Sequence, residues 1–182
     1  MSNEQKKGPG DSWKTPPEIF NNLNREFNFM ADMAASHKNA LCTLHFTEEQ
    51  DSLSFDWAGE ACLQSNRSRY VWCNPPYSNP LPWVNKALES QKDGLGVVML
   101  LNNDMSITWF ARALIGVSEI RCIVATETEG SRTGYVPGRI AFINENDEPI
   151  KSNNKPQFIL VFNPFKVGAQ VTTYVSKSEL YN

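Results

Sequence analysis

The chain contains, at residues 68–77, the stretch SRYVWCNPPY, in which an apolar segment runs into two consecutive prolines. Tyrosine, valine and tryptophan favour strands, so residues 68–73 are expected to form one. Proline has no backbone N–H to contribute to a central ladder, so Asn74-Pro75-Pro76-Tyr77 should lie on the loop at the carboxyl end of this strand. Ligands of α/β sheets bind at that end of the strands. The stretch therefore predicts an α/β sheet with a functional loop directly after one strand.

Helical and strand patterns alternate on both sides of this stretch. The expected helices are residues 16–26, 82–93 and 107–115, and the further expected strands are residues 27–33, 96–101, 120–125, 139–144 and 157–162. A polar turn region joins the last two strands, which predicts an antiparallel hairpin. The fold class is therefore expected to be α/β, a doubly wound sheet with helices on both faces and a C-terminal antiparallel hairpin. One expected strand ends at Asp32 and another ends before Asn74, so the topology is expected to bring these polar residues to one edge of the sheet. Residues 36–66, 126–138 and the segment after Pro164 show no regular pattern beyond a short strand or turn near 53–57.

The start of the first helix has its own signal. Thr15 can cap a helix, the prolines at 16 and 17 suit a first helical turn, and Glu18 stands three residues after Thr15. Residues 1–12 are polar and contain Gly8-Pro9-Gly10, so they are expected to be a disordered lead-in before a single domain over residues 13–182.

Composition restricts the class of protein. The 182 residues are 41% hydrophobic, which supports a real core. No apolar run approaches the roughly 20 residues of a membrane span, and the first residues do not resemble a signal peptide, so a cytoplasmic protein is expected. Cys42 and His45 have a C-x-x-H spacing near His37, but a zinc site needs a second pair, so no metal is expected.

Charge is distributed unevenly along the chain. The formal net charge is −3, whereas residues 31–60 alone carry −5, which leaves +2 for the rest. Phosphates demand cations, so any surface that faces a nucleic acid would have to lie outside residues 31–60. The alternative is that residues 31–60 form an ordinary solvated acidic face.

The loop after the strand suits transfer of a group to an exocyclic amine. Such an amine on adenine has two N–H donors and a delocalised lone pair. The side-chain carbonyl of Asn74 and a backbone carbonyl, most simply that of Pro75, can accept from both donors. The prolines hold these acceptors rigidly before substrate arrives. Tyr77 offers a ring for base stacking, worth ~1–3 kcal/mol. The alternative is that these four residues only form a turn that ends the strand, with the tyrosine packed in the core.

An ordered set of motifs extends this pattern from Trp13 to Phe165. The set comprises Trp13-x-Thr15-Pro16, Asp32-x-Ala34-Ala35-Ser36, Asp51-x-Leu53, Asn74-Pro75-Pro76-Tyr77-Ser78, Trp83 and Gly138-Arg139-Ile140-Ala141-Phe142. It resembles the small phage-type DNA N6-adenine methyltransferases, or phage Dam family. The resemblance implies a Rossmann-like methyltransferase sheet, S-adenosyl-L-methionine as cofactor and transfer of methyl to adenine N6 in DNA. It also implies catalytic roles for Asn74, Pro75, Pro76 and Tyr77.

The resemblance implies cofactor contacts at three segments. Thr15 and Pro16 match the segment that touches the methionine part, and Asp32 and Ala34 match the start of the cofactor loop. Asp51 and Leu53 match the segment that receives the adenosine, with Asp56 as a rival acid. Asp32 could instead be a turn former and Asp51 a surface residue. The loop after Asp32 lacks the glycines that are usual in methyltransferases.

Double-stranded DNA is the expected partner. The polar loop 126–138 is predicted to contact it through Ser131, Arg132, Thr133 and Tyr135, although a plain surface loop is the alternative. The target adenine must leave the stack to reach Tyr77. A chain of this length has no separate recognition domain, so specificity would come from loops or from a homodimer. The family name suggests GATC or a related palindrome, and the resemblance suggests a phage enzyme in the bacterial host cytoplasm that protects viral DNA from restriction.

Two other functions stay open at this point. The same tetrapeptide suits a planar glutamine amide, so the chain could methylate RNA or a protein. It could also be a nucleic-acid-binding module without turnover, although the intact tetrapeptide opposes this.

Overall fold

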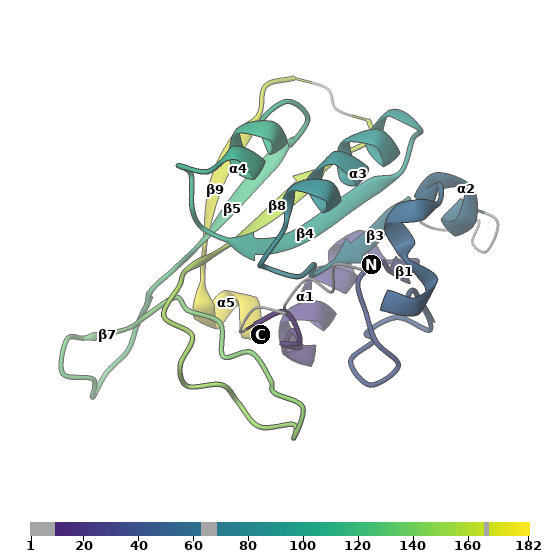
Figure 1. Ribbon diagram of the computed structural model, residues 1–182. Coiled ribbons are helices and arrows are strands. Elements are labelled where there is room, and N and C mark those ends of the chain that lie inside the picture. The colour runs from purple at the N-terminus through teal and green to yellow at the C-terminus, as the bar shows by residue number, and fades with distance from the viewer. Residues whose placement is uncertain (1–9, 63–68, 166–167) are drawn as a thin grey trace.

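The computed structural model describes residues 10–62, 69–165 and 168–182 and centres on a seven-stranded sheet (Figure 1). The strand order is β2-β1-β3-β4-β8-β5-β9. The strands are β1 (Ala31–Asp32), β2 (Leu44–His45), β3 (Tyr70–Cys73), β4 (Gly96–Asn102), β5 (Glu119–Val124), β8 (Gln157–Phe162) and β9 (Val171–Ser176). All run parallel except β8, which lies antiparallel between β4 and β5.

Helices cover both faces of this sheet. They are α1 (Pro17–Phe27), α2 (Trp57–Cys62), α3 (Leu81–Lys92), α4 (Thr108–Ala113) and α5 (Lys177–Tyr181). Buried side chains of α2, α3 and α4 pack on one face, and those of α1 and α5 pack on the other. The sequence favours core positions for Trp57, Trp72, Trp83 and Trp109; three of them are buried in these layers, and Trp83 is partly buried and packs against the core. The predicted α/β fold with helices on both faces is therefore confirmed.

The first helix ends later in the chain than predicted, and the first strand begins later. The prediction of a helix over 16–26 agrees with α1, but Phe27 completes its buried stripe instead of beginning a strand. Asn28 ends the helix in the left-handed region, at φ 52°. The predicted strand 27–33 is thereby wrong over most of its length, since only Ala31–Asp32 pairs with its neighbours.

The predicted hairpin of strands 139–144 and 157–162 is also wrong. Residues 157–162 do form β8, but β4 and β5 already occupy both of its edges, so no edge is free for 139–144. The backbone of that segment bonds elsewhere: Ile140 N–H donates to the Gln157 side chain at 3.3 Å, and Ala141 N–H donates to the Tyr181 hydroxyl at 3.2 Å.

An antiparallel hairpin occurs instead within the predicted loop 126–138. Strands β6 (Thr126–Glu127) and β7 (Tyr135–Val136) form it, and it projects from the body of the molecule (Figure 1). Gly138 lies at its base, where a Cβ would come 2.5 Å from the backbone of Val124. This close approach requires glycine and fixes the base of the hairpin against β5.

Two stretches without a clear sequence pattern are ordered. Within residues 36–62 the chain forms β2, the 3-10 helices η1 (Glu48–Gln50) and η2 (Ser52–Ser54), and α2. After Pro164 it forms β9 and α5, and α5 binds α1 through Asn22 Nδ2 to Glu179 O at 3.0 Å and Arg25 Nη2 to Asn182 O at 2.8 Å. Of the expected disordered lead-in, residues 1–9 lie outside the described residues, and residues 10–12 form a turn.

None of the helices in the described ranges has the length and hydropathy of a membrane-crossing segment.

Candidate active site

Polar residues follow three neighbouring parallel strands where each strand ends. Asp32 ends β1, Asn74 follows β3 and Asn102 ends β4. Because β1 pairs with β3 and β3 with β4 in parallel, these ends meet at one edge of the sheet. The sequence predicted this meeting for Asp32 and Asn74 and missed the contribution of β4.

A hydrogen bond holds the side chain of Asn74 and leaves its carbonyl oxygen free to accept another. Its Nδ2 donates to the backbone oxygen of Trp13 at 3.2 Å. Its Oδ1 is buried and accepts no hydrogen bond. Since a buried carbonyl oxygen without a donor is costly, this oxygen is placed to receive a donor from a ligand. Pro75, next in the chain, is buried, and Pro76 is half-buried.

Tyr77 closes the tetrapeptide against the core. Its ring meets Phe142 edge-on, with 5.9 Å between centroids. Its hydroxyl is buried without a partner, and burial raises the pKa of Tyr77 well above its ordinary value. The hydroxyl therefore stays protonated and can donate to a ligand.

Thr15 does not cap α1, contrary to the sequence prediction. The N-cap position is Pro16, which is buried and makes no side-chain cap bond, while Thr15 Oγ1 is buried without a partner. In the part of the chain that the structure describes, only three buried side-chain N or O atoms lack a partner: Thr15 Oγ1, Asn74 Oδ1 and Tyr77 Oη. Native proteins satisfy such atoms almost always, and all three belong to residues that the sequence predicted for the site.

Four predicted site residues surround one small hollow. Its lining includes Thr15, Asp32, Ala34 and Asn74, and its volume is about 10 Å³. Asp32 is 3% exposed and accepts from the backbone N–H of Ala34 at 3.3 Å and of Leu41 at 3.2 Å. Loss of hydration raises its pKa to about 6, against the opposing effect of these two bonds and of His45.

A larger cavity lies at the other end of the tetrapeptide. Its volume is about 270 Å³, and it is lined by Tyr77, Pro80, Asn102, Asn103, Asp104, Ile107, Trp109, Lys155 and Pro156. The first residue of the tetrapeptide thus lines the small hollow and the last lines the large cavity. The sequence reasoning missed Asn102, Asn103, Asp104 and Lys155. The signal was present, because three polar residues directly follow the apolar run of β4, as Asn74 follows β3.

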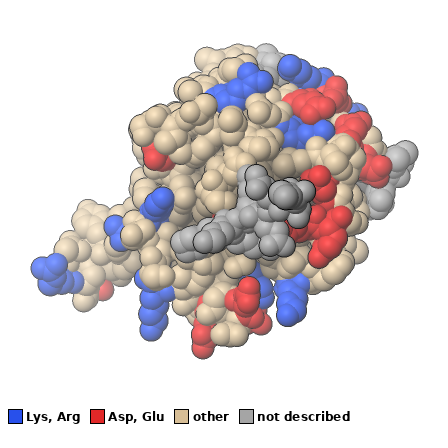
Figure 2. All heavy atoms as spheres, viewed as in Figure 1, with Lys and Arg blue, Asp and Glu red and all other residues tan. Residues whose placement is uncertain are grey.

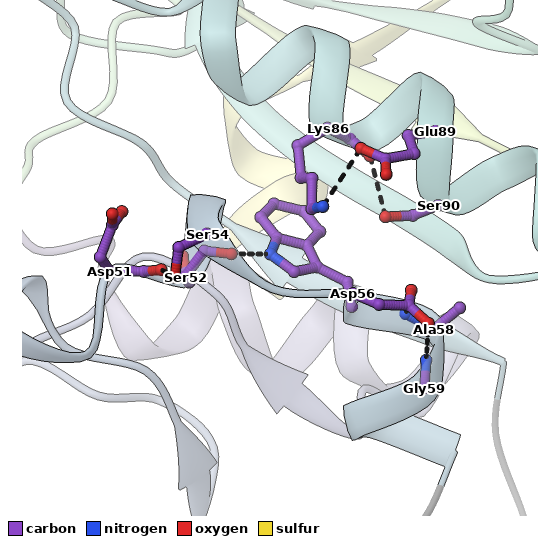
Figure 3. Close-up of polar contacts among 10 residues, drawn as sticks. Asp51, Ser52, Ser54, Asp56, Ala58, Gly59, Lys86, Glu89 and Ser90 are labelled. Atoms are coloured by element: carbon purple, nitrogen blue, oxygen red, sulfur yellow. Dashed lines mark hydrogen bonds and ion pairs between the residues drawn. The ribbon is translucent and has the colours of Figure 1, made fainter.

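Asp51 and Leu53 line neither of these two cavities. Asp51 adopts the left-handed conformation, at φ 45°, between η1 and η2. The next residue, Ser52, donates from Oγ to the backbone oxygen of Met33 at 2.6 Å, which ties this segment to the end of β1. The rival acid Asp56 is occupied locally, since its carboxylate accepts from the N–H groups of Ala58 and Gly59 at the start of α2 (Figure 3).

A buried indole holds the Asp51 segment in place. Trp57 donates from Nε1 to the backbone oxygen of Ser52 at 2.6 Å, and its ring is fully buried (Figure 3). The exposed carboxylate of Asp51 points away from these contacts (Figure 3). Leu53 is partly buried and packs against the core.

The four predicted DNA-contacting residues lie together on the β6–β7 hairpin. Ser131 Oγ and Thr133 Oγ1 both donate to the backbone oxygen of Tyr135 at 3.2 Å, which shapes the tip. Arg132 is exposed and Tyr135 is 50% exposed. Figure 2 shows both basic and acidic side chains on this projection, and a larger group of acidic side chains on the opposite side of the view, where α2 and β1 lie. Residues 126–138 contain one basic residue, Arg132, and two acidic residues, Glu127 and Glu129.

In the described ranges, no three His, Cys, Asp or Glu side chains are close enough together to hold a metal ion. His37 Nδ1 and His45 Nε2 lie 3.0 Å apart and satisfy one another.

Comparison with known proteins gives consistent matches. The family model described as DNA N-6-adenine-methyltransferase (Dam) matches residues 2–182. The DNA N-6-adenine-methyltransferase of Haemophilus phage HP1 is 37% identical over 180 residues, which cover 96% of this chain and 92% of the relative. That of Escherichia phage T1 is 34% identical over 170 residues, 91% of this chain and 68% of the relative. The putative methyltransferase YfdM of Escherichia coli K12 is 35% identical over 78 residues, 42% of this chain and 78% of the relative.

Proposed function

Because this chain belongs to the DNA N-6-adenine-methyltransferase (Dam) family, we propose that it methylates adenine N6 in DNA at the loop Asn74-Pro75-Pro76-Tyr77. One observation supports this location above the others: the tetrapeptide separates two hollows, and unpartnered buried atoms lie at both of its ends. A transferase of this kind needs a donor site and an acceptor site on either side of its catalytic group.

The small hollow is proposed as part of the donor site, with S-adenosyl-L-methionine as the donor. This cofactor supplies an electrophilic methyl group on a positively charged sulfur. The residues suit it chemically, since the carboxylate of Asp32 offers negative charge and the hydroxyl of Thr15 lacks a partner. Ala34 lines the hollow, Pro16 directly follows Thr15 in the chain, and Asp51 with Leu53 is proposed to extend the site toward the adenosine portion. Because the hollow is only about 10 Å³, the segment containing Asn39 and Leu41 must move outward to admit the methionine portion.

The large cavity is proposed as the acceptor site for a flipped adenine. Asn74 Oδ1 accepts from one N–H of the exocyclic amine, and a backbone carbonyl of the proline pair accepts from the other. Held in this way, the nitrogen lone pair is directed toward the donor side. The ring of Tyr77 provides a stacking surface, and Phe142 holds that ring from its edge. The cavity of about 270 Å³ is ample for one base.

Double-stranded DNA is proposed to lie against the β6–β7 hairpin. Ser131, Arg132, Thr133 and Tyr135 would contact it, with Arg132 directed at the phosphates. Specificity would come from loops of the single domain over residues 13–182, or from a homodimer. Since two of the three relatives named above are phage enzymes, the proposed place of action is the cytoplasm of a bacterial host.

The test is incubation of purified protein with labelled S-adenosyl-L-methionine and unmethylated duplex DNA, followed by mass spectrometry for N6-methyladenine. RNA and glutamine-containing protein are tested as rival acceptors. The Asn74→Ala variant should lose about 10²–10³ in kcat, as removal of one positioned hydrogen-bonding group does elsewhere. Asn85→Ala, an exposed residue of α3, is the matched control and should keep full activity. An Asn74→Ala protein as active as the wild type would refute the proposed site, and methyl transfer to RNA or protein alone would refute the DNA substrate.

A further inference from the structure

Gln157 is a fully buried amide at the edge of the sheet that carries the site. It is the first residue of β8 and pairs with Asn102, the last residue of β4. The other residues of β8 are apolar and buried, so an amide here is costly unless every polar atom is used. Gln157 uses them all. Nε2 donates to Lys155 O at 2.8 Å and to Asn102 Oδ1 at 3.4 Å, and Oε1 accepts from Ile140 N–H and from Asn153 Nδ2, both at 3.3 Å.

The partners of Gln157 belong to the segments that enclose the acceptor cavity. Asn102 and Lys155 both line it. A backbone bond from Asn103 N–H to Pro156 O, at 2.9 Å, joins the same two walls a second time. Ile140 stands two residues before Phe142, whose ring supports Tyr77. One side chain therefore connects both walls of the cavity to the support of the stacking tyrosine.

We propose that Gln157 is a positioning residue for the methyl acceptor, which it serves by fixing Asn102, Lys155 and the segment 140–142 around the base. This inference rests on the proposed function, in which the target adenine enters that cavity. None of these hydrogen-bond partners of Gln157 lines the small hollow, so the proposed role concerns the acceptor site and not the donor site. Productive geometry must be held within about 0.5 Å, and a misplacement of about 1 Å can cost about a hundredfold in rate.

The experiment compares Gln157→Met with a matched variant, Gln91→Met. Gln91 is also an amide that joins two backbone carbonyls, Gly116 O at 2.8 Å and Asn163 O at 2.9 Å. It does so from the last turn of α3, and neither Gln91 nor these two partners lines the cavity, so it reports the cost of losing such an amide without affecting the cavity. Thermal unfolding is measured for both, and initial rates are measured with DNA and S-adenosyl-L-methionine varied separately.

Gln157→Met should lower kcat about ten- to a hundredfold and leave the KM for S-adenosyl-L-methionine within about twofold. Gln91→Met should lower Tm to a similar degree and keep kcat. Equal effects of the two variants on kcat, or a Gln157→Met enzyme with wild-type kcat, would overturn the inference.

If Gln157→Met does not fold, Asn153→Ser replaces it. Asn153 binds Gln157 and, through Nδ2, Ile140 O at 2.9 Å, but it does not line the cavity. A smaller loss of kcat in the same direction supports the inference, and unchanged kcat contradicts it. A wild-type protein that methylates no DNA would refute the proposed function itself, so the two failures are told apart.

Discussion

Replacing Asp32 by asparagine should stabilise the protein at neutral pH and weaken its hold on the methyl donor. Asp32 is almost completely buried, and its pKa of about 6 lies above the ordinary 3.8. In the folded state the carboxyl therefore binds its proton more tightly than in the unfolded state. Its contribution to stability is fully present below pH 3.8 and is lost as the pH rises through 6. The loss is on the order of 3 kcal/mol, since each pKa unit corresponds to about 1.36 kcal/mol.

Asparagine does not ionise, so the Asp32→Asn variant avoids this loss. The asparagine amide has one oxygen, which can still accept from Ala34 or Leu41, whereas its nitrogen cannot replace the second carboxylate oxygen. The loss of that hydrogen bond lowers the free energy of unfolding by the same amount at every pH. The difference in unfolding free energy between variant and wild type should therefore shift by about 3 kcal/mol in favour of the variant between pH 4 and pH 7.5.

Urea denaturation at a series of pH values measures this difference. Other titrating groups act alike in both proteins and cancel. Asp51→Asn replaces an exposed carboxylate and is the control. Isothermal calorimetry with S-adenosyl-L-methionine at pH 7.5 should show weaker binding by the Asp32→Asn protein, and wild-type affinity should fall as the pH drops through 6. A variant-to-wild-type difference that stays constant from pH 4 to 7.5 would refute the reasoning.

Three further substitutions test separate parts of the site. Thr15→Val removes a buried hydroxyl that has no partner, so Tm should stay the same or rise. Affinity for S-adenosyl-L-methionine should fall about tenfold, which corresponds to the loss of one hydrogen bond. Unchanged affinity in calorimetry would contradict this. Arg132→Ala should weaken DNA binding and lower the slope of log K against log salt by about 1, whereas Lys92→Ala at the far end of α3 should change neither. An unchanged salt slope would remove Arg132 from the interface. Trp57→Phe loses the bond to Ser52 O and should cost about 1–3 kcal/mol in chemical denaturation; a protein of wild-type stability would show that this bond does not hold the Asp51 segment.

The sequence correctly predicted the helices and strands whose position follows from a local hydrophobic pattern. The stripe of Ile19, Phe20 and Leu23 predicted α1, and the apolar runs predicted β4 and β8, because burial alone determines where such residues go. Strand-ending polar residues predicted that Asp32 and Asn74 would meet. The order of parallel strands then placed them together without any knowledge of the loops.

The errors arose where distant parts of the chain competed for the same partners. Residues 139–144 have a strand-like pattern, yet both edges of β8 were already taken, and long-range pairing of that kind has no local signal. Threonine is a common N-cap residue, but the N-cap position of α1 is occupied by Pro16 and not by Thr15. The acceptor cavity was missed because it needs Asn102 and Lys155 from segments 53 residues apart, which only the antiparallel insertion of β8 brings together.

The contact between α5 and α1 determines when the molecule can be completed. One face of the sheet is covered by a helix from residues 17–27 and a helix from residues 177–181, bound to each other. These bonds join residues that are 157 positions apart in the chain, so α1 is synthesised long before the segment that binds it. This face of the sheet is therefore completed only after the residues of α5 have been synthesised.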